Sequence, residues 1–228
     1  MLTDVELQAL WLSFKVSSRA VLFALPLAIA CAWLLARRRF WGKTLFDGLV
    51  HLPLVLPPVV VGYLLLVLLG TQAPVGAWLK DTFGIRLVFT AAGASVAVAV
   101  TTFPLMVRAI RLSIEAIDPG LEEAARTLGA GAWDRFFSVT LPLMLPGVLA
   151  GAVIAFAAGL GEFGAVITFV SNIPGETQTL PLAIYSATQT PGGEAAAARL
   201  ALLSIALALG GLMLAEVLGR RVQRSMGR

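Results

Sequence analysis

Residues 141–160 read LPLMLPGVLAGAVIAFAAGL, a run without a single charged side chain. A helix of about 20 residues is about 30 Å long, which matches the thickness of the hydrocarbon core of a bilayer. Inside that core every backbone polar group has to be satisfied within the protein, and a helix does this along its own axis. The segment therefore predicts a transmembrane helix.

Four further apolar blocks lie on either side of this segment. They are long enough to cross a bilayer as helices and cover residues 9–36, 49–69, 87–107 and 195–218. Pro26, Pro58 and Pro104 lie inside three of them. Neighbouring membrane helices can satisfy the backbone groups that these prolines leave free. We therefore expect five transmembrane helices.

The composition agrees with a membrane protein. Hydrophobic residues make up 58% of the 228 residues and charged residues 13%, whereas soluble domains carry about 25% charged residues. This excludes an ordinary soluble enzyme and a disordered chain. One cysteine and one histidine cannot form a disulfide or a structural zinc site. We expect one all-α integral membrane domain over residues 1–228, with no catalytic residues, bound cofactor or metal.

The basic residues predict the orientation of the chain. With five crossings, the connections after the first and third blocks and the tail after the fifth share one side of the membrane. That side holds 12 of the 17 basic residues: Arg37, Arg38, Arg39, Lys43, Arg108, Arg111, Arg126, Arg135, Arg220, Arg221, Arg224 and Arg228. Positive charge favours the cytoplasmic side. We therefore expect a periplasmic N-terminus and a cytoplasmic C-terminus, with no role in binding nucleic acid.

The stretch from residue 163 to residue 190 does not fit the pattern of a full crossing. Its apolar part is short, and neutral polar residues follow. We expect an outward-facing or re-entrant segment, which requires cover by protein or by a water-filled cavity. Two interpretations stay open, a solvated loop or a neutral lining for the substrate path. The candidate path or gate residues are Glu162, Ser171, Asn172, Thr188 and Gln189.

The loop of residues 108–140 is charged and has a helical pattern. Asp118 can cap a helix that begins at Pro119. An apolar stripe then follows at helical spacing, formed by Leu121, Ala124, Ala125 and Leu128. Gly129 permits a sharp turn, and a second short amphipathic helix with Trp133 leads into Leu141 and Pro142. From physics alone, this helix–turn–helix is either a docking surface for another protein or a helix lying on the membrane surface.

One spacing in this loop carries a resemblance. Glu123-Ala124-Ala125, three residues, Gly129, nine residues, Val139, one residue and Leu141-Pro142 resemble the EAA loop of ABC-importer permeases, with Val in place of the usual Ile. The whole chain also resembles the molybdate permeases of the ModB family. The stretches that carry this wider resemblance are His51–Pro58, Phe103–Ala109, Gly161–Gly164 and Ser171–Thr177.

The resemblance implies a type I ABC-importer permease fold with cytoplasmic coupling helices. Two copies of the chain would form the pathway within the lipid of the inner membrane. A dimer of ModC-like ATPase subunits would bind ATP and magnesium, and a periplasmic ModA-like protein would deliver molybdate. The residues implied in ATPase docking are Glu122, Glu123, Ala124, Ala125, Leu128, Gly129, Trp133, Leu141 and Pro142.

Two alternatives remain at this point. Sulfate and tungstate are tetrahedral dianions like molybdate, so a permease for either anion would look similar. A secondary transporter would need no ATPase, but it would have no use for the glycine at EAA spacing and should show an intramembrane site for a coupling ion.

Overall fold

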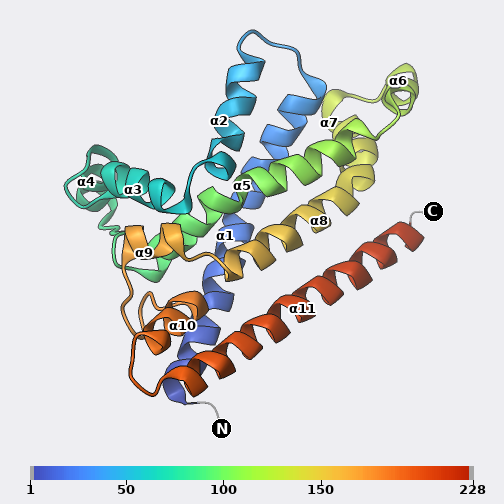
Figure 1. The fold of residues 1–228 in the computed structure, drawn as a ribbon. Helices are drawn as coiled ribbons and strands as arrows, with labels where there is room; N and C mark the ends of the chain where they lie inside the picture. The colour runs from blue at the N-terminus through green and yellow to red at the C-terminus, as the bar shows by residue number, and fades with distance from the viewer. Residues whose placement is uncertain (1–2, 226–228) are drawn as a thin grey trace.

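The computed structural model describes residues 3–225, which are mostly helical and contain no strand. Arg228, one of the basic residues counted above, lies outside the described residues. The elements, drawn in Figure 1, are α1 (Asp4–Arg37), α2 (Lys43–Val55), α3 (Pro58–Leu69), α4 (Pro74–Phe83), α5 (Ala91–Glu115), α6 (Pro119–Thr127), α7 (Ala132–Arg135), the π-helical turn η1 (Phe136–Thr140), α8 (Leu141–Leu160), α9 (Gly164–Val170), α10 (Leu180–Thr188) and α11 (Glu194–Ser225).

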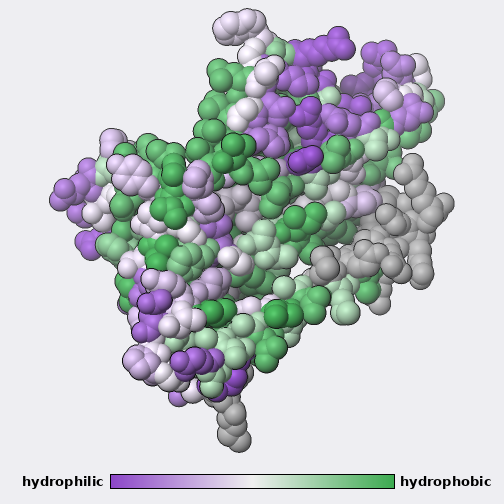
Figure 2. All heavy atoms as spheres, viewed as in Figure 1, coloured by the Kyte–Doolittle hydropathy of each residue, from purple (hydrophilic) through white to green (hydrophobic). Residues whose placement is uncertain are grey.

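The prediction of an all-α membrane protein is confirmed. Four continuous helices are long and apolar enough to cross a membrane: α1, α5, the continuous run from Ala132 to Leu160, and the part of α11 up to Gly211. The bent pair formed by α2 and α3 gives a fifth crossing if it is counted as one span. Figure 2 agrees with this assignment, because hydrophobic residues cover the middle of the face shown and hydrophilic residues gather near its ends.

Helix α5 is the centre of the bundle. It packs most extensively against α1 and α8, and it also contacts α2, α3 and α9. Figure 1 shows α5 running beside α8 and crossing α1, with α11 on the other side of α8. A fold built around one helix depends on how closely its neighbours can approach that helix.

Two apolar cores lie at the two ends of α5. The first includes Val98 of α5 and the fully buried Phe169 of α9. The second includes Met106 and Ile110 of α5 and Met144 of α8. Lipid tails are as apolar as these side chains, so removal from water does not drive the helices together. Close van der Waals contact, summed over many atom pairs, is what holds them.

Glycines allow that close contact between α8 and α5. A Cβ atom added at Gly147 would lie 2.2 Å from Cβ of Ser113 and 3.0 Å from the backbone oxygen of Ala109. A Cβ atom added at Gly151 would lie 3.2 Å from the backbone oxygen of Met106. Gly147 and Gly151 form a GxxxG motif, whose small residues here permit close packing of the two helices.

The prediction of one continuous helix over residues 49–69 is wrong. The chain forms two helices, α2 and α3, that meet at an angle of 114° after Val55. Pro57 and Pro58 explain the break. The residue before a proline is pushed out of the helical region, and two successive prolines remove two backbone donors. Leu56 and Pro57 accordingly have extended ψ angles of 143° and 135°.

The third and fifth predicted spans differ from the observed helices at their ends. The third begins and ends later than expected, and the fifth is longer than expected. The third was expected at 87–107, but α5 begins at Ala91 because the Thr90 hydroxyl accepts a hydrogen bond from the backbone N–H of Gly93. It then continues to Glu115, so the first part of the expected loop is helix. The sequence also missed α4, whose first residue is Pro74. The fifth span, expected at 195–218, is α11, which extends to Ser225.

Residues 163–190 form two short helices with irregular backbone between them. Helix α9 packs against α3 and α5, and helix α10 packs against α11 and α1. Ala165, Val166, Phe169 and Val170 of α9 are buried. Neither helix is long enough to cross a bilayer by itself. The segment is covered by protein on several sides, which is the condition that a re-entrant segment requires.

We predict that Gly147→Ala destabilises the protein. The added methyl group collides with Ser113, and overpacking of this kind costs about 1–3 kcal/mol. The melting temperature of the purified protein in detergent should fall. Gly210→Ala in α11 is the matched control, because a Cβ atom there meets no atom within 4 Å. Equal melting temperatures for the two variants would contradict the proposed close contact.

Candidate functional site

Helix α6 and the turn after it form as the sequence predicts. The Asp118 side chain accepts a hydrogen bond of 2.8 Å from the backbone N–H of Gly120, and Pro119 is the first helical residue. Gly129 has a φ angle of +88°. Its N–H donates to the carbonyl of Arg126, and the N–H of Ala130 donates to that of Ala125. These two bonds are the Schellman pattern, in which a left-handed residue closes the helix.

The apolar stripe of α6 is not covered by the chain itself. None of the residues of α6 is buried. Leu121 is 48% exposed, Leu128 is 88% exposed and the nearby Trp133 is 77% exposed. Figure 1 shows α6 projecting beyond the ends of α5 and α8. Large exposed apolar side chains gathered on one projecting element are typical of an interaction surface.

Glu122 and Glu123 have different roles in this loop. Glu122 faces its own chain: one carboxylate oxygen lies 3.1 Å from the Arg37 guanidinium and accepts a hydrogen bond of 2.9 Å from the buried Thr140 hydroxyl. Glu123 is exposed. Glu122 therefore fixes α6 to the end of α1 and to η1, while Glu123 remains on the outer surface. Nothing in the local pattern of residues predicts this difference.

The second helix of the loop is not a separate unit, contrary to the sequence interpretation. Residues Ala132–Leu160 form one continuous helical run. The π-helical turn η1 lies inside it, and the N–H of Leu141 donates to the carbonyl of Phe136. Pro142 explains the wide turn, because its ring would clash with the preceding turn of an ordinary α-helix and it has no N–H to donate. Leu141 packs against the second core, and Pro142 is exposed.

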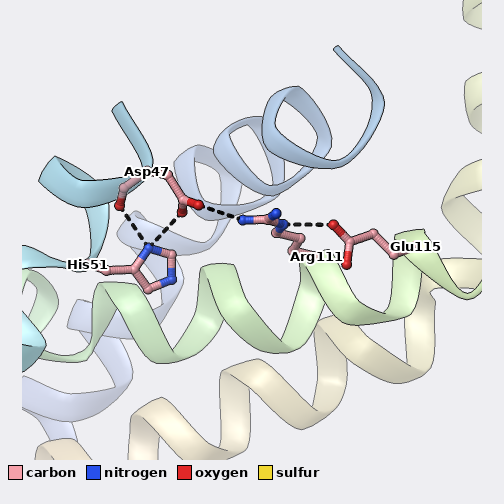
Figure 3. A network of polar contacts seen from close by, with 4 residues as sticks. All are labelled: Asp47, His51, Arg111 and Glu115. Atoms are coloured by element: carbon pink, nitrogen blue, oxygen red, sulfur yellow. Dashed lines mark hydrogen bonds and ion pairs between the residues drawn. The ribbon is translucent and has the colours of Figure 1, made fainter. Parts of the chain in front are cut away.

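A polar network links α2 to α5 near the same end of the molecule (Figure 3). Nη1 of Arg111 donates a hydrogen bond of 2.9 Å to Asp47, and Nε of Arg111 donates one of 2.8 Å to Glu115. Nδ1 of His51 lies 2.9 Å from the backbone oxygen of Asp47 and 3.0 Å from its carboxylate. Both neighbours are acceptors, so Nδ1 carries a proton. His51 is thereby a structural residue of this network.

The network lies in a cavity of about 580 Å³ between α2 and α5. The cavity also contains Arg108, which is exposed. The sequence alone does not predict this network. Its only local signal is the spacing of four residues between Asp47 and His51 and between Arg111 and Glu115, which places each pair on one helix face.

The predicted path residues fall into two groups. Asn172 donates a hydrogen bond of 2.8 Å to the Ser186 hydroxyl and accepts one of 3.0 Å from the Gln178 amide. Thr188 and Gln189 lie at the exposed end of α10, outside these contacts. The interpretation as a solvated loop is wrong for residues 177–179, which are buried, and it agrees with the exposure of Thr188 and Gln189.

Ser171 and Glu162 shape the backbone around α9. Ser171 has a φ angle of +65°, and its carbonyl accepts a hydrogen bond of 3.1 Å from the Thr177 hydroxyl. Glu162 accepts a hydrogen bond of 3.0 Å from the backbone N–H of Ala165. A carboxylate at the start of a helix also faces the positive end of the helix dipole.

The family model for the binding-protein-dependent transport system inner membrane component matches residues 24–224. The molybdenum transport system permease protein ModB of Escherichia coli is 60% identical over 228 residues, which cover all of both chains. This chain belongs to the ModB family of molybdenum transport permeases. The sulfate transport system permease protein CysT of Escherichia coli is 39% identical over 194 residues, which cover 84% of this chain and 70% of CysT.

The fold of this chain is similar to that of chains in solved ABC transporter structures. A chain from the crystal structure of a bacterial ABC transporter that imports alginate superposes with a TM-score of 0.77 at 20% identity. The match covers 96% of this chain and 80% of the other. The type I importer fold implied by the EAA spacing is therefore confirmed. The relatives named above are permease proteins, so the chain is a membrane subunit.

We predict that Glu122→Ala loosens the coupling loop. The substitution removes both contacts that fix α6 to Arg37 and Thr140, so local opening should become easier. Cleavage by trypsin after Arg126 in the folded protein should be about fivefold faster, the effect of losing about 1 kcal/mol of local stability. Glu123→Ala is the matched control, because its side chain is exposed and forms no ion pair among residues 3–225. Equal cleavage of the two variants would show that Glu122 does not fix α6.

Proposed function

We propose that this chain is the membrane-spanning subunit of an ATP-driven importer that carries molybdate across the bacterial inner membrane. The observation that carries the proposal is the full-length identity of 60% to a molybdenum transport permease. The projecting, uncovered α6 supports the same proposal, because an importer that hydrolyses ATP on a separate subunit needs a surface on which that subunit can dock. This chain itself does no covalent chemistry and binds no cofactor.

Two copies of the chain would enclose the pathway. A periplasmic binding protein would deliver the anion at one end, and an ATPase dimer carrying ATP and magnesium would contact α6 at the other. The N-terminus would be periplasmic and the C-terminus cytoplasmic, as the 12 basic residues on one side favour. Each part of this assembly is inferred from the family and from the charge distribution.

Motion of the ATPase would reach the spans through contacts present in the structure. The outer face of α6 offers Glu123, Ala124 and Leu128 to the ATPase. Its inner face is fixed to α1 and η1 through Glu122. Because η1 continues directly into α8, closure of the ATPase dimer would pull on α1 and α8 together. Rigid-body rocking of packed helices is a common form of switching in transporters.

The anion would pass neutral hydrogen-bond donors rather than a positively charged site that binds it too tightly. Molybdate is a dianion, and conduction requires a site that binds weakly enough to release it. The amides of Asn172 and Gln178 and the hydroxyl of Ser186 are neutral and lie within one hydrogen-bonded group. Glu162, used as a helix cap, has no free role as an anion ligand. Ser171, Asn172, Thr188 and Gln189 remain candidates for the path or gate.

Sulfate is the second candidate substrate, since the sulfate permease CysT is a relative at 39% identity. Molybdate and sulfate differ little in shape and charge. The higher identity and the complete coverage favour the molybdenum permease, so we place molybdate first.

We predict ATP-dependent uptake of radiolabelled molybdate. The complex of this chain with its ATPase would be reconstituted in vesicles, with the binding protein and molybdate on the outer side and ATP on the side of α6. Uptake should require ATP and should persist in excess sulfate. Uptake of sulfate in preference to molybdate would favour the second candidate. Uptake of molybdate without ATP would contradict an ATP-driven importer.

We predict that Gly129→Val weakens ATPase docking and transport. Valine at a φ angle of +88° has a conformational free energy that is higher by roughly 1–2 kcal/mol. The backbone would therefore change at this turn, and the orientation of α6 would change with it. Uptake should fall by about tenfold or more, and less ATPase should co-purify. Gly42→Val is the matched control, since Gly42 also has a positive φ angle of +85°, meets no atom within 4 Å and lies outside the coupling loop. Normal coupling in Gly129→Val would show that this loop is not the docking element.

A further inference from the structure

A cleft of about 550 Å³ separates α1 from the run formed by α7 and η1. Its α1 wall consists of Pro26, Ile29, Ala30 and Trp33. These residues follow the spacing i, i+3, i+4 and i+7, so they form one stripe along about 10 Å of the helix. The cleft is therefore a slot that runs along a membrane-spanning helix.

The opposite wall is aromatic. Trp133 and Phe136 line it, and Trp133 is 77% exposed. Near the slot, α1 exposes two further large apolar side chains, Phe23 at 77% and Leu27 at 60%. α1 is long and apolar enough to cross a membrane, so we expect side chains exposed along it to face acyl chains rather than water. The slot is thus an apolar depression beside a surface that we expect to contact acyl chains.

The mouth of the slot is positively charged. Arg38 and Arg135 both line it. Arg38 is exposed and Arg135 is half-buried, and neither forms an ion pair among the described residues 3–225. The Arg38 guanidinium lies 5.2 Å from the centre of the Trp33 ring. Glu122 also lines the cleft, but its charge is compensated by Arg37 at 3.1 Å. Two uncompensated positive charges remain at the mouth.

We propose that the slot binds one anionic phospholipid, with an acyl chain along the α1 stripe and the headgroup phosphate between Arg38 and Arg135. Three features favour a lipid as the occupant. The slot is apolar along its length, it opens on a membrane-facing surface, and its charge is complementary to a phosphate. Tryptophan beside arginine at the end of a membrane helix is also typical of the headgroup level.

The position of this lipid has a consequence for the coupling loop. One arginine belongs to the end of α1 and the other to α7, so a single headgroup would bridge the two elements. Glu122 makes the other bridge between α1 and this region. The bound lipid would therefore stabilise the orientation of Trp133 and α6 relative to the spans.

The test measures lipid binding by the purified complex of this chain with its ATPase. Phosphatidylglycerol and phosphatidylcholine with identical chains would be titrated in detergent and counted by native mass spectrometry. One phosphatidylglycerol should bind per chain. In the double variant R38Q and R135Q its binding should weaken by about 25-fold, because each basic side chain near an anionic headgroup contributes about fivefold. The double variant R39Q and R86Q removes the same charge from exposed positions outside the cleft and should bind as the unaltered protein does.

A third variant tests the slot without changing its charge. Ala30→Trp fills the apolar wall and should also release phosphatidylglycerol. Equal binding of the two lipids, or unchanged binding in R38Q and R135Q, would overturn the proposal. Loss of the ATPase in R38Q and R135Q with unchanged lipid binding would assign the cleft to a protein partner instead. The readout does not involve molybdate, so it is independent of the proposed transport function.

Discussion

Close approach of α8 to α5 is the contact on which the rest of the structure depends. In a bilayer the helices gain nothing by leaving water, so they stay together through packing and through polar contacts between them. Gly147 and Gly151 let the two backbones meet, and Met106, Ile110 and Met144 fill the space beside them. Once this pair is fixed, α1 can pack along α5 and α11 along α8.

Polar contacts then set the positions of the elements that packing alone does not fix. Arg111 joins α2 to α5, Glu122 joins α6 to α1 and η1, and Glu6 near the N-terminus accepts a hydrogen bond of 2.9 Å from Arg199 of α11. Each contact connects segments that are far apart in the sequence. Two of them lie near the basic end of the bundle, beside the surface proposed for the ATPase.

Local chemistry was the part that the sequence could predict. Asp118, Pro119 and Gly129 act within a few residues of themselves, so the start and the end of α6 followed from residue types alone. The break at Pro57 could not be decided in advance, because a proline in a membrane helix is either accommodated or breaks the helix according to its neighbours. The pairing of Glu122 with Arg37 has no local signal. It arises only when the fold brings two distant segments together.

The continuous run from Ala132 to Leu160 has a mechanical consequence. At 1.5 Å per residue its 29 residues form a rod about 43 Å long. One end carries the exposed Trp133, and the other end stops just before Glu162 and the cap of α9. If the run moves as one body, a small tilt applied at one end becomes a lateral displacement at the other. The α5 contact at Gly147 and Gly151 lies between the two ends, where it would serve as the fulcrum.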